Sequence, residues 1–196
     1  LSRRPGAVAV AGALTIAFSA ILVKLADVEP ATAAIFRCFY ALPALGLLAW
    51  LEDRRYGARP LRSRRLAIPA GIFFAADLIF WHHAIGDVGA GLATVLGNLQ
   101  VVVVPFAAWM VLGERIQPRL LAALPLVCSG VVLISGVLET GAYGEHPMRG
   151  VVFGILTGLS YAGFILVLRQ AGADLRRPAG PLFDATAVAT VAALIA

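Results

Sequence analysis

Residues 66–112 read LAIPAGIFFAADLIFWHHAIGDVGAGLATVLGNLQVVVVPFAAWMVL. Only Gly86 and Asp87 separate two apolar runs in this stretch, residues 66–85 and 88–112. An α-helix needs about 20 apolar residues to cross roughly 30 Å of hydrocarbon, and each run approaches that length. The stretch therefore predicts two antiparallel transmembrane helices joined by a very short turn.

Further apolar runs of similar length occupy most of the remaining chain. They are residues 6–26, 31–51, 119–138, 150–170 and 181–196, the last of them incomplete. The runs are long and continuous, whereas strands of a membrane barrel are about 10 residues long and alternate in polarity. The chain is also 60% hydrophobic and 14% charged, which excludes an ordinary soluble domain. We therefore predict an all-α, polytopic transmembrane helix bundle.

The two ends of the chain bear on this assignment. Ser2, Arg3 and Arg4 precede an apolar run, as they would in a secretory signal peptide. That run has the length of a full span, and no small-residue cleavage site leads from it into a polar domain, so we interpret it as the first transmembrane helix. Because the sequence starts at Leu1 and stops inside an apolar run, we expect it to be a piece of a longer protein.

The formal net charge of +5 comes from basic residues that lie between the apolar runs. This placement favours orientation in a membrane over binding of nucleic acid, because Lys and Arg prefer the cytoplasmic loops of inner-membrane proteins. A cytoplasmic N-terminus puts most of them on one side: Arg3, Arg4, Arg54, Arg55, Arg59, Arg62, Arg64, Arg65, Arg115, Arg119, Arg169, Arg176 and Arg177. We therefore predict a multi-pass protein of the inner or plasma membrane with a cytoplasmic N-terminus.

Weak internal repetition links the sixth apolar run to the first. A shift of about 145 positions aligns Thr15 with Ser160 and Lys24 with Arg169. A repeat of five helices inserts its second copy upside down, which is the arrangement of many transporters. The sequence thus predicts inverted five-helix repeats, of which the second is truncated.

One part of the chain carries a family resemblance. The stretch 84–96, Pro105, the element Leu112-Gly113-Glu114-Arg115 and the run Ser129-Gly130-Val131-Val132-Leu133 resemble the EamA-type members of the drug/metabolite transporter superfamily. The resemblance implies a ten-helix carrier with both ends in the cytoplasm. Residues 6–138 would form the first EamA-like repeat and residues 150–196 the start of the second. Members export amino acids, nucleotide-type metabolites, sugars or drugs, so the resemblance implies a class of protein and no substrate.

Asp77 is the most informative single residue. It lies about 11 residues into its predicted span, or roughly 16 Å at helical rise, and thus near the middle of the bilayer. A charge at that depth costs about 2.5 to 3.5 kcal/mol on insertion scales. We predict that Asp77 contacts a substrate amine or couples transport to protons. A structural contact between two helices is the open alternative.

Asn98 and Gln100 fall at similar depth in the next predicted span. Across the hairpin they could meet Asp77 or each other and help to bind the substrate. Amide side chains also commonly hold transmembrane helices together, at about 0.6 to 2 kcal/mol each. Packing is therefore the favoured interpretation of these two residues, although both remain candidates for substrate binding.

Trp81, His82 and His83 stand toward the outer end of the span that contains Asp77. Paired histidines suggest a metal site or a pH sensor, but adjacent residues point to different faces of a helix. We therefore predict no metal site. Trp81 and His82 are candidates for the outer part of a substrate path.

Two further side chains could face the same path. Arg37 lies about two turns inside its predicted span and could attract a carboxylate or phosphate of the substrate. It could equally extend to the membrane surface or pair with a nearby acid. Tyr161 offers a hydroxyl group within the bundle and could form a pocket wall.

A separate set of residues is assigned to structure or gating. Gly150, Gly154 and Gly158 form two consecutive GxxxG steps, a face that lets another helix approach closely. Pro105 could kink its helix by removing one backbone hydrogen bond. Glu114 follows an apolar run, and the resemblance implies that it stabilises the turn to the next helix.

These observations favour a secondary membrane transporter that exports a small metabolite, amino acid or drug-like compound by alternating access. A non-transporting membrane scaffold or a channel-like protein is the alternative. The sequence contains no H-E-x-x-H, G-x-S-x-G or nucleotide-binding loop, so we predict neither an enzyme nor a cofactor. The expected partners are a small-molecule substrate and the lipid bilayer, with a homodimer as an open option and no nucleic acid.

Overall fold

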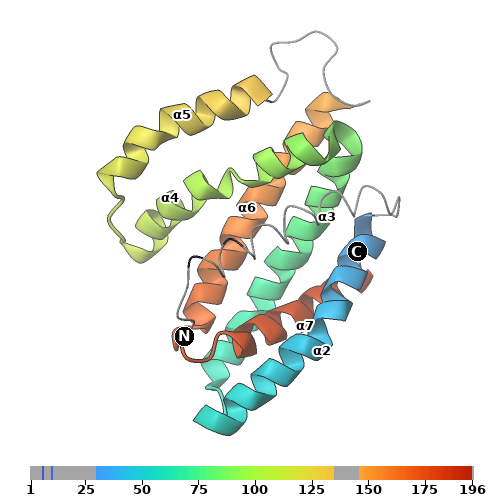
Figure 1. Ribbon diagram of the computed structural model, residues 1–196, viewed down its shortest axis with the longest axis vertical. Helices are drawn as coiled ribbons and strands as arrows, with labels where there is room; N and C mark the ends of the chain where they lie inside the picture. The colour runs from blue at the N-terminus through green and yellow to red at the C-terminus, as the bar shows by residue number, and fades with distance from the viewer. Residues whose placement is uncertain (1–5, 7–9, 11–29, 135–145, 196) are drawn as a thin grey trace.

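The computed structural model describes residues 30–134 and 146–195, together with Gly6 and Val10. Its described segments form the helices α2 (Pro30–Tyr56), α3 (Leu61–Gly97), α4 (Gln100–Leu112), α5 (Pro118–Ile134), α6 (Pro147–Ala171) and α7 (Ala179–Ile195) (Figure 1). The predicted first helix, residues 6–26, lies outside the described residues apart from those two. Each other predicted apolar run corresponds to one or two of these helices.

Three of the described helices are long and apolar enough to cross a membrane: Ala34–Tyr56 within α2, α3 and α6. The described part of the chain is helical and contains no strand. This finding confirms the prediction of a helical, multi-pass membrane protein. The helices α4 and α7 and the apolar part of α5 are shorter than a full span.

The reversal between the two central helices occurs at Gly89, so the predicted turn at Gly86 and Asp87 is misplaced. Helical bonding continues through both residues, and Gly89 then adopts φ 82° and ψ 161°. Glycine has no Cβ and tolerates positive φ, which allows the chain to reverse without a loop. A Cβ on Gly97 would lie 3.9 Å from Cδ1 of Trp81, so the two arms of α3 run side by side beyond the reversal.

The predicted span 88–112 is also not one continuous helix. It is interrupted at Asn98 and Leu99. There the amide of Leu99 donates to the carbonyl of Leu96 at 3.0 Å, a bond between residues three apart that forms a 3₁₀-type turn, tighter than the turn of an α-helix. The Asn98 side chain donates to the carbonyl of Thr94 and so competes for a backbone acceptor. Pro105 lies inside α4, away from this interruption.

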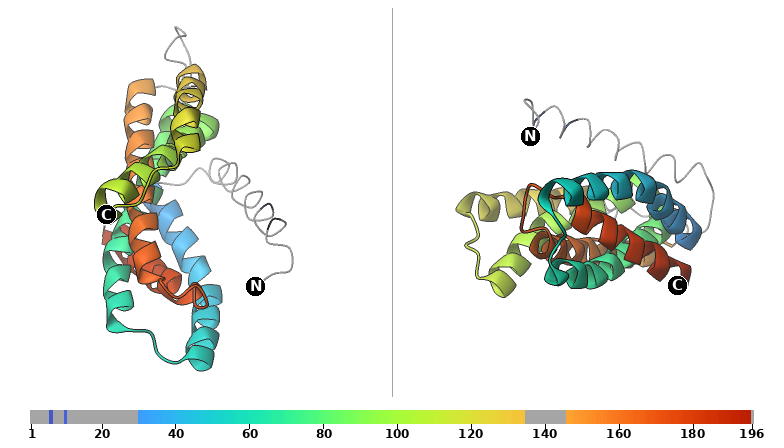
Figure 2. Two further views of the ribbon diagram at one scale, coloured as in Figure 1. Left: turned by 90° about the vertical axis from the view of Figure 1, so that its left-hand side faces the viewer. Right: turned by 90° about the horizontal axis from the view of Figure 1, so that it is seen from below.

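The helices α2, α3, α6 and α7 form the body of the molecule, and α4 and α5 extend from it (Figures 1 and 2). Small residues line the junction of α2, α3 and α7, where Ala34, Cys38, Ala75 and Ala189 are buried. Helices packed through small side chains approach closely and gain dispersion energy, which is the main stabilisation available inside a membrane. The body therefore depends on close helix contacts.

The glycine face of α6 packs against α3 at its reversal and along its second arm. A Cβ on Gly154 would lie 2.5 Å from Cβ of Leu96, and one on Gly150 would collide with Val88. A Cβ on Gly158 would lie 3.4 Å from the carbonyl oxygens of Leu96 and Gly97, which is ordinary contact. At Gly150 and Gly154, the absence of a side chain is what permits the observed separation of α3 and α6.

Candidate functional site

Polar and aromatic side chains gather where α2 faces the middle of α3. Asp77 and Trp81 are four residues apart and therefore share one face of α3, and His82 lies about 100° further around the helix. Asp77 and His82 are only 7% and 5% exposed. The guanidinium carbon of Arg37 on α2 lies 5.0 Å from the centre of the Trp81 ring. We call these four residues the central cluster.

The charges of Arg37 and Asp77 are close enough to interact. Among the described residues, however, no ion pair or hydrogen bond joins them or involves the Asp77 carboxylate. Buried charges in proteins are normally paired, because an isolated ion loses several kcal/mol of solvation. The described residues therefore leave the hydrogen-bonding capacity of these two groups unused.

Within the described part of the chain, three buried polar atoms have no hydrogen-bond partner: Nη1 of Arg37, Nε2 of His82 and Oε1 of Gln100. Nδ1 of His82 contacts the carbonyl oxygen of Leu78, which can only accept, so Nδ1 carries the proton. In the neutral ring, Nε2 is then an acceptor. The region thus offers one cationic donor together with several acceptors.

The other predicted site residues lie in different places. Tyr161 on α6 is close enough for its hydroxyl to interact with the Asp77 charge. The backbone of Gln100, at the start of α4, lies beside Gly158. Asn98 is exposed and bonded to its own helix, so the structure does not bring it to Asp77. His83 is also exposed, and its ring stacks on Phe153.

The two ends of the helix body differ in their polar contacts. We name them the Gly89 end, where α3 reverses, and the Arg59 end, where the chain enters α3. At the Gly89 end, Arg149 of α6 donates through Nε and Nη2 to both oxygens of Asp87, at 2.9 and 2.6 Å. This bidentate pair joins α3 to the start of α6. Because Asp87 is 5% exposed, Arg149 offsets the cost of burying a carboxylate.

Replacing Arg149 with glutamine should lower the thermal stability of the protein by more than the same change at Arg176. Arg176 is exposed and pairs with Asp174 of its own loop. Arg149→Gln should cost more because the Asp87 carboxylate would stay buried without its cationic partner. Melting temperatures in detergent measure the difference. Equal melting temperatures for the two variants would contradict the assigned role of Arg149.

Contacts at the Arg59 end were not predicted from the sequence. The Glu52 carboxylate, near the end of α2, accepts from the backbone amides of Ala179 and Gly180 at 3.0 and 2.9 Å. It thereby caps the start of α7, where a helix has free N–H groups and a partial positive charge. Arg59 donates to Asp53 and Asp184, at 3.2 and 2.7 Å. The sequence did contain a signal for these contacts, because Glu52 and Asp53 directly precede an arginine-rich loop.

The Leu-Gly-Glu-Arg element also contributes to the Arg59 end. Gly113 adopts φ 68°, and its amide donates to the carbonyl of Trp109, which ends α4. Glu114 then accepts two bonds from Arg169 of α6, at 3.0 and 2.5 Å. These bonds hold the pKa of Glu114 below its usual range, so the contact persists at neutral pH and is lost only on acidification.

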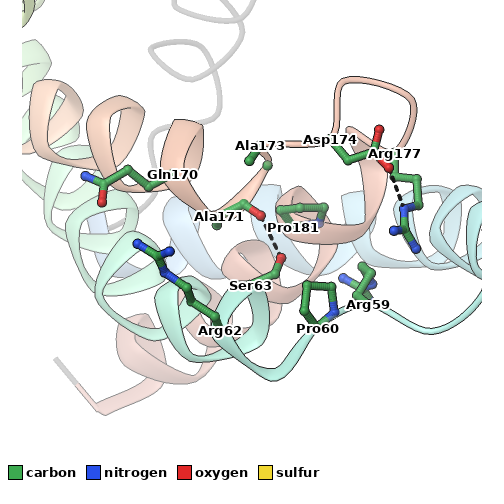
Figure 3. Close-up of a pocket in the computed structure, with 11 residues that line it drawn as sticks. Arg59, Pro60, Arg62, Ser63, Gln170, Ala171, Ala173, Asp174, Arg177 and Pro181 are labelled. Atoms are coloured by element: carbon green, nitrogen blue, oxygen red, sulfur yellow. Dashed lines mark hydrogen bonds and ion pairs between the residues drawn. The ribbon is translucent and has the colours of Figure 1, made fainter. Parts of the chain in front are cut away.

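A pocket of about 290 Å³ opens between the start of α3 and the loop from α6 to α7 (Figure 3). Ser63 donates to the carbonyl of Ala171 at 2.7 Å across one side of it. In the loop, Asp174 accepts bonds from Arg176 and Arg177, which lower its pKa to about 2. The loop therefore keeps these contacts at any pH above that value.

Apolar helices of spanning length, close contacts between small residues and a buried polar cluster define a class, the polytopic helical membrane proteins with a polar interior. The sequence pattern of the EamA-like transporter family matches residues 5–136. The chain belongs to the EamA-like transporter family, whose members are membrane transporters and not enzymes.

Curated proteins similar to this chain include zinc transporters named ZupT. The protein from Escherichia coli O7:K1 (strain IAI39 / ExPEC) is 34% identical over 83 residues, which cover 41% of this chain and 30% of that relative. Those from Escherichia coli O1:K1 / APEC and O9:H4 (strain HS) are 32% identical over 83 residues. The chain thus spans about 30% of their length. No solved structure matches it.

Zinc is attributed to those relatives alone. In residues 30–134 and 146–195, no three or more His, Cys, Asp or Glu side chains gather in a group that could hold a metal ion. His82 and Asp77 both lie on α3 without completing such a group.

Proposed function

We propose that the protein is a secondary transporter that exports a small polar metabolite, an amino acid or a drug-like compound by alternating access. The observation that carries this proposal is the central cluster, in which half-buried Arg37 and buried Asp77 and His82 have hydrogen-bonding capacity that no described residue uses. Ionisable groups inside a membrane are costly and usually mark a substrate or ion pathway. Membership of a transporter family supports the same conclusion.

Each residue of the cluster has a distinct proposed role. Arg37 would bind an anionic group of the substrate and Asp77 a cationic group, while His82 would accept a hydrogen bond through Nε2. Trp81 would form an apolar wall. Gln100 and Tyr161 would complete the path from α4 and α6. A substrate that carries both charges, such as an amino acid, would satisfy more of these groups than an uncharged one.

Polar contacts at both ends of the body supply proposed gates. Asp87 and Arg149 join α3 to α6 at the Gly89 end, and Glu52 joins α2 to the start of α7 at the Arg59 end. Under the predicted repeats, each contact links the first repeat to the second. Alternating access requires the repeats to move against each other, so one end would have to release its contacts while the other keeps them.

We further propose that the Arg59 end faces the cytoplasm of an inner membrane. The ends of α2 and α6, the start of α3, the loop before α7 and the turn after α4 carry most of the arginines. Contacts such as Ser63 with Ala171 and Glu114 with Arg169 bring these segments together at one end. The positive-inside preference then assigns that end to the cytoplasm.

The test is untargeted metabolite analysis of the medium of cells that produce the full-length gene product, beside cells with an empty vector. We expect at least one small compound to accumulate outside only when the protein is present. The purified protein should then move that compound across liposome membranes with saturable kinetics and exchange across the bilayer. Both properties distinguish a carrier from a channel.

Three outcomes would count against the proposal in different ways. Accumulation inside the cells would contradict export and favour uptake. Flux that rises linearly with concentration would favour a channel-like protein. No flux of any compound, from a protein correctly inserted in the membrane, would favour a scaffold without transport activity.

A further inference from the structure

The pocket at the Arg59 end lies apart from the central cluster. It is formed by the start of α3, the end of α6 and the first residues of α7 (Figure 3). Pro60, Ala171 and Pro181 supply apolar walls. Arg62 stands on one side of the pocket and Arg177 on the other. The pocket therefore combines an apolar surface with cationic groups and one carboxylate, Asp174, which is paired with Arg176 and Arg177.

The arginines around this pocket differ in how their charge is balanced. Arg59, whose side chain is 7% exposed, is paired with Asp53 and Asp184. Arg177 is bonded to Asp174 and to backbone carbonyls at the end of α2. Arg62 is exposed, and no acidic partner for it exists in the described ranges. Its guanidinium is available to a ligand.

Two neighbouring arginines add to the unbalanced charge. Arg64 and Arg65 are exposed, lie within one turn of Arg62, and have no ion-pair partner among the described residues. The first turn of α3 contains no acidic residue. Cations at the start of a helix are unfavourable, because the free amide groups there already carry partial positive charge. A bound anion would relieve this repulsion.

We propose that the pocket binds the phosphate group of an anionic phospholipid, with Arg62 as its main ligand and Arg177 as a second cation. The pocket lies where the membrane-spanning helices α3 and α6 end, which is the level of the lipid headgroups. Basic pockets between helices at this level are suited to anionic headgroups. Its apolar walls suit the glycerol and first methylene groups of a lipid, which free phosphate lacks.

Such a lipid would connect the start of α3 to the loop between α6 and α7. Ser63 and Ala171 already make one direct contact between these segments. A headgroup held by Arg62 and Arg177 would add a second link at the same place. The lipid would thus stabilise the arrangement of the Arg59 end that the structure shows. The binding itself does not depend on the proposed transport function.

The test uses the full-length protein in detergent, titrated with phosphatidylglycerol or phosphatidylcholine and analysed by native mass spectrometry. We expect one phosphatidylglycerol molecule to bind more tightly than phosphatidylcholine. Arg62→Gln should weaken phosphatidylglycerol binding about fivefold, the effect of one arginine beside an anionic headgroup. Arg62→Lys should keep most of the affinity.

The matched control is Arg55→Gln, which removes the same charge from an exposed arginine at the same end that does not line the pocket. Its affinity for phosphatidylglycerol should stay within about twofold of the unmodified protein. Equal weakening by Arg55→Gln and Arg62→Gln would overturn the site in favour of general surface attraction. Equal binding of the two lipids would also overturn it. Displacement of phosphatidylglycerol by millimolar inorganic phosphate would identify free phosphate as the ligand and overturn the lipid assignment.

Discussion

Replacing Asp77 with asparagine should abolish transport by the full-length protein while leaving its insertion into the membrane intact. Asp77 is 7% exposed, and no hydrogen bond or ion pair among the described residues uses its carboxylate. In the proposed role, the Asp77 carboxylate contacts a cationic group of the substrate. Loss of one member of such a buried charged contact costs about 3 kcal/mol or more, so transport should fall at least about 100-fold. Efflux from liposomes loaded with the exported compound measures the effect.

The companion variant for this prediction is Asp77→Glu, which keeps the negative charge and changes the length of the side chain. It should retain measurable transport if the charge binds the substrate or a proton. A purely structural role would produce a different pattern, in which Asp77→Asn lowers the amount of folded protein and leaves the transport rate per molecule unchanged. That pattern would refute the proposed role of Asp77.

Replacing Gly154 with valine should destabilise the protein by about 3 kcal/mol, the upper part of the usual cost of overpacking. A Cβ at this position would lie 2.5 Å from Cβ of Leu96, which is itself 2% exposed. Neither backbone can yield locally, so α6 would have to move away from the second arm of α3. Unfolding followed by thermal or denaturant titration in detergent measures the loss.

Gly130→Val is the matched control, because a Cβ on Gly130 of α5 meets no atom within 4 Å. It introduces the same side chain into a helix with open space around it and should change stability little. If the Gly154→Val and Gly130→Val variants had equal melting temperatures, the described close packing of α6 against α3 would be wrong. Gly154→Val should also reduce transport, because the proposed movement takes place across this contact.

The helices themselves were largely predictable from the sequence. Whether an apolar segment can span a membrane depends on its length against the thickness of the hydrocarbon, and both quantities are local. Hence α2, α6 and α7 appear close to the predicted runs 31–51 and 150–170 and the run that starts at residue 181. The misplaced turn shows the limit, because Gly86, Gly89 and Gly91 are equally plausible sites of reversal by composition.

The candidate site was predictable in part for the same reason. Asp77, Trp81 and His82 belong to one helix, so their closeness in sequence and the shared face of Asp77 and Trp81 follow from helical periodicity. Arg37 lies on a different helix, and its position over Trp81 depends on how α2 packs against α3. Asn98 matched the depth of Asp77 but turned out exposed, because depth along a helix does not specify which side faces the interior.

The sequence by itself determined the class of the protein and its hydrophobic segments, because hydrophobicity and charge act residue by residue against a bilayer of fixed thickness. Only the tertiary structure decided where the chain reverses at Gly89 and which distant groups meet. Glu52 caps α7 across 127 positions, and Arg149 pairs with Asp87 across 62. Such contacts depend on the packing of small residues between helices, and neither hydropathy nor charge pattern specifies that packing.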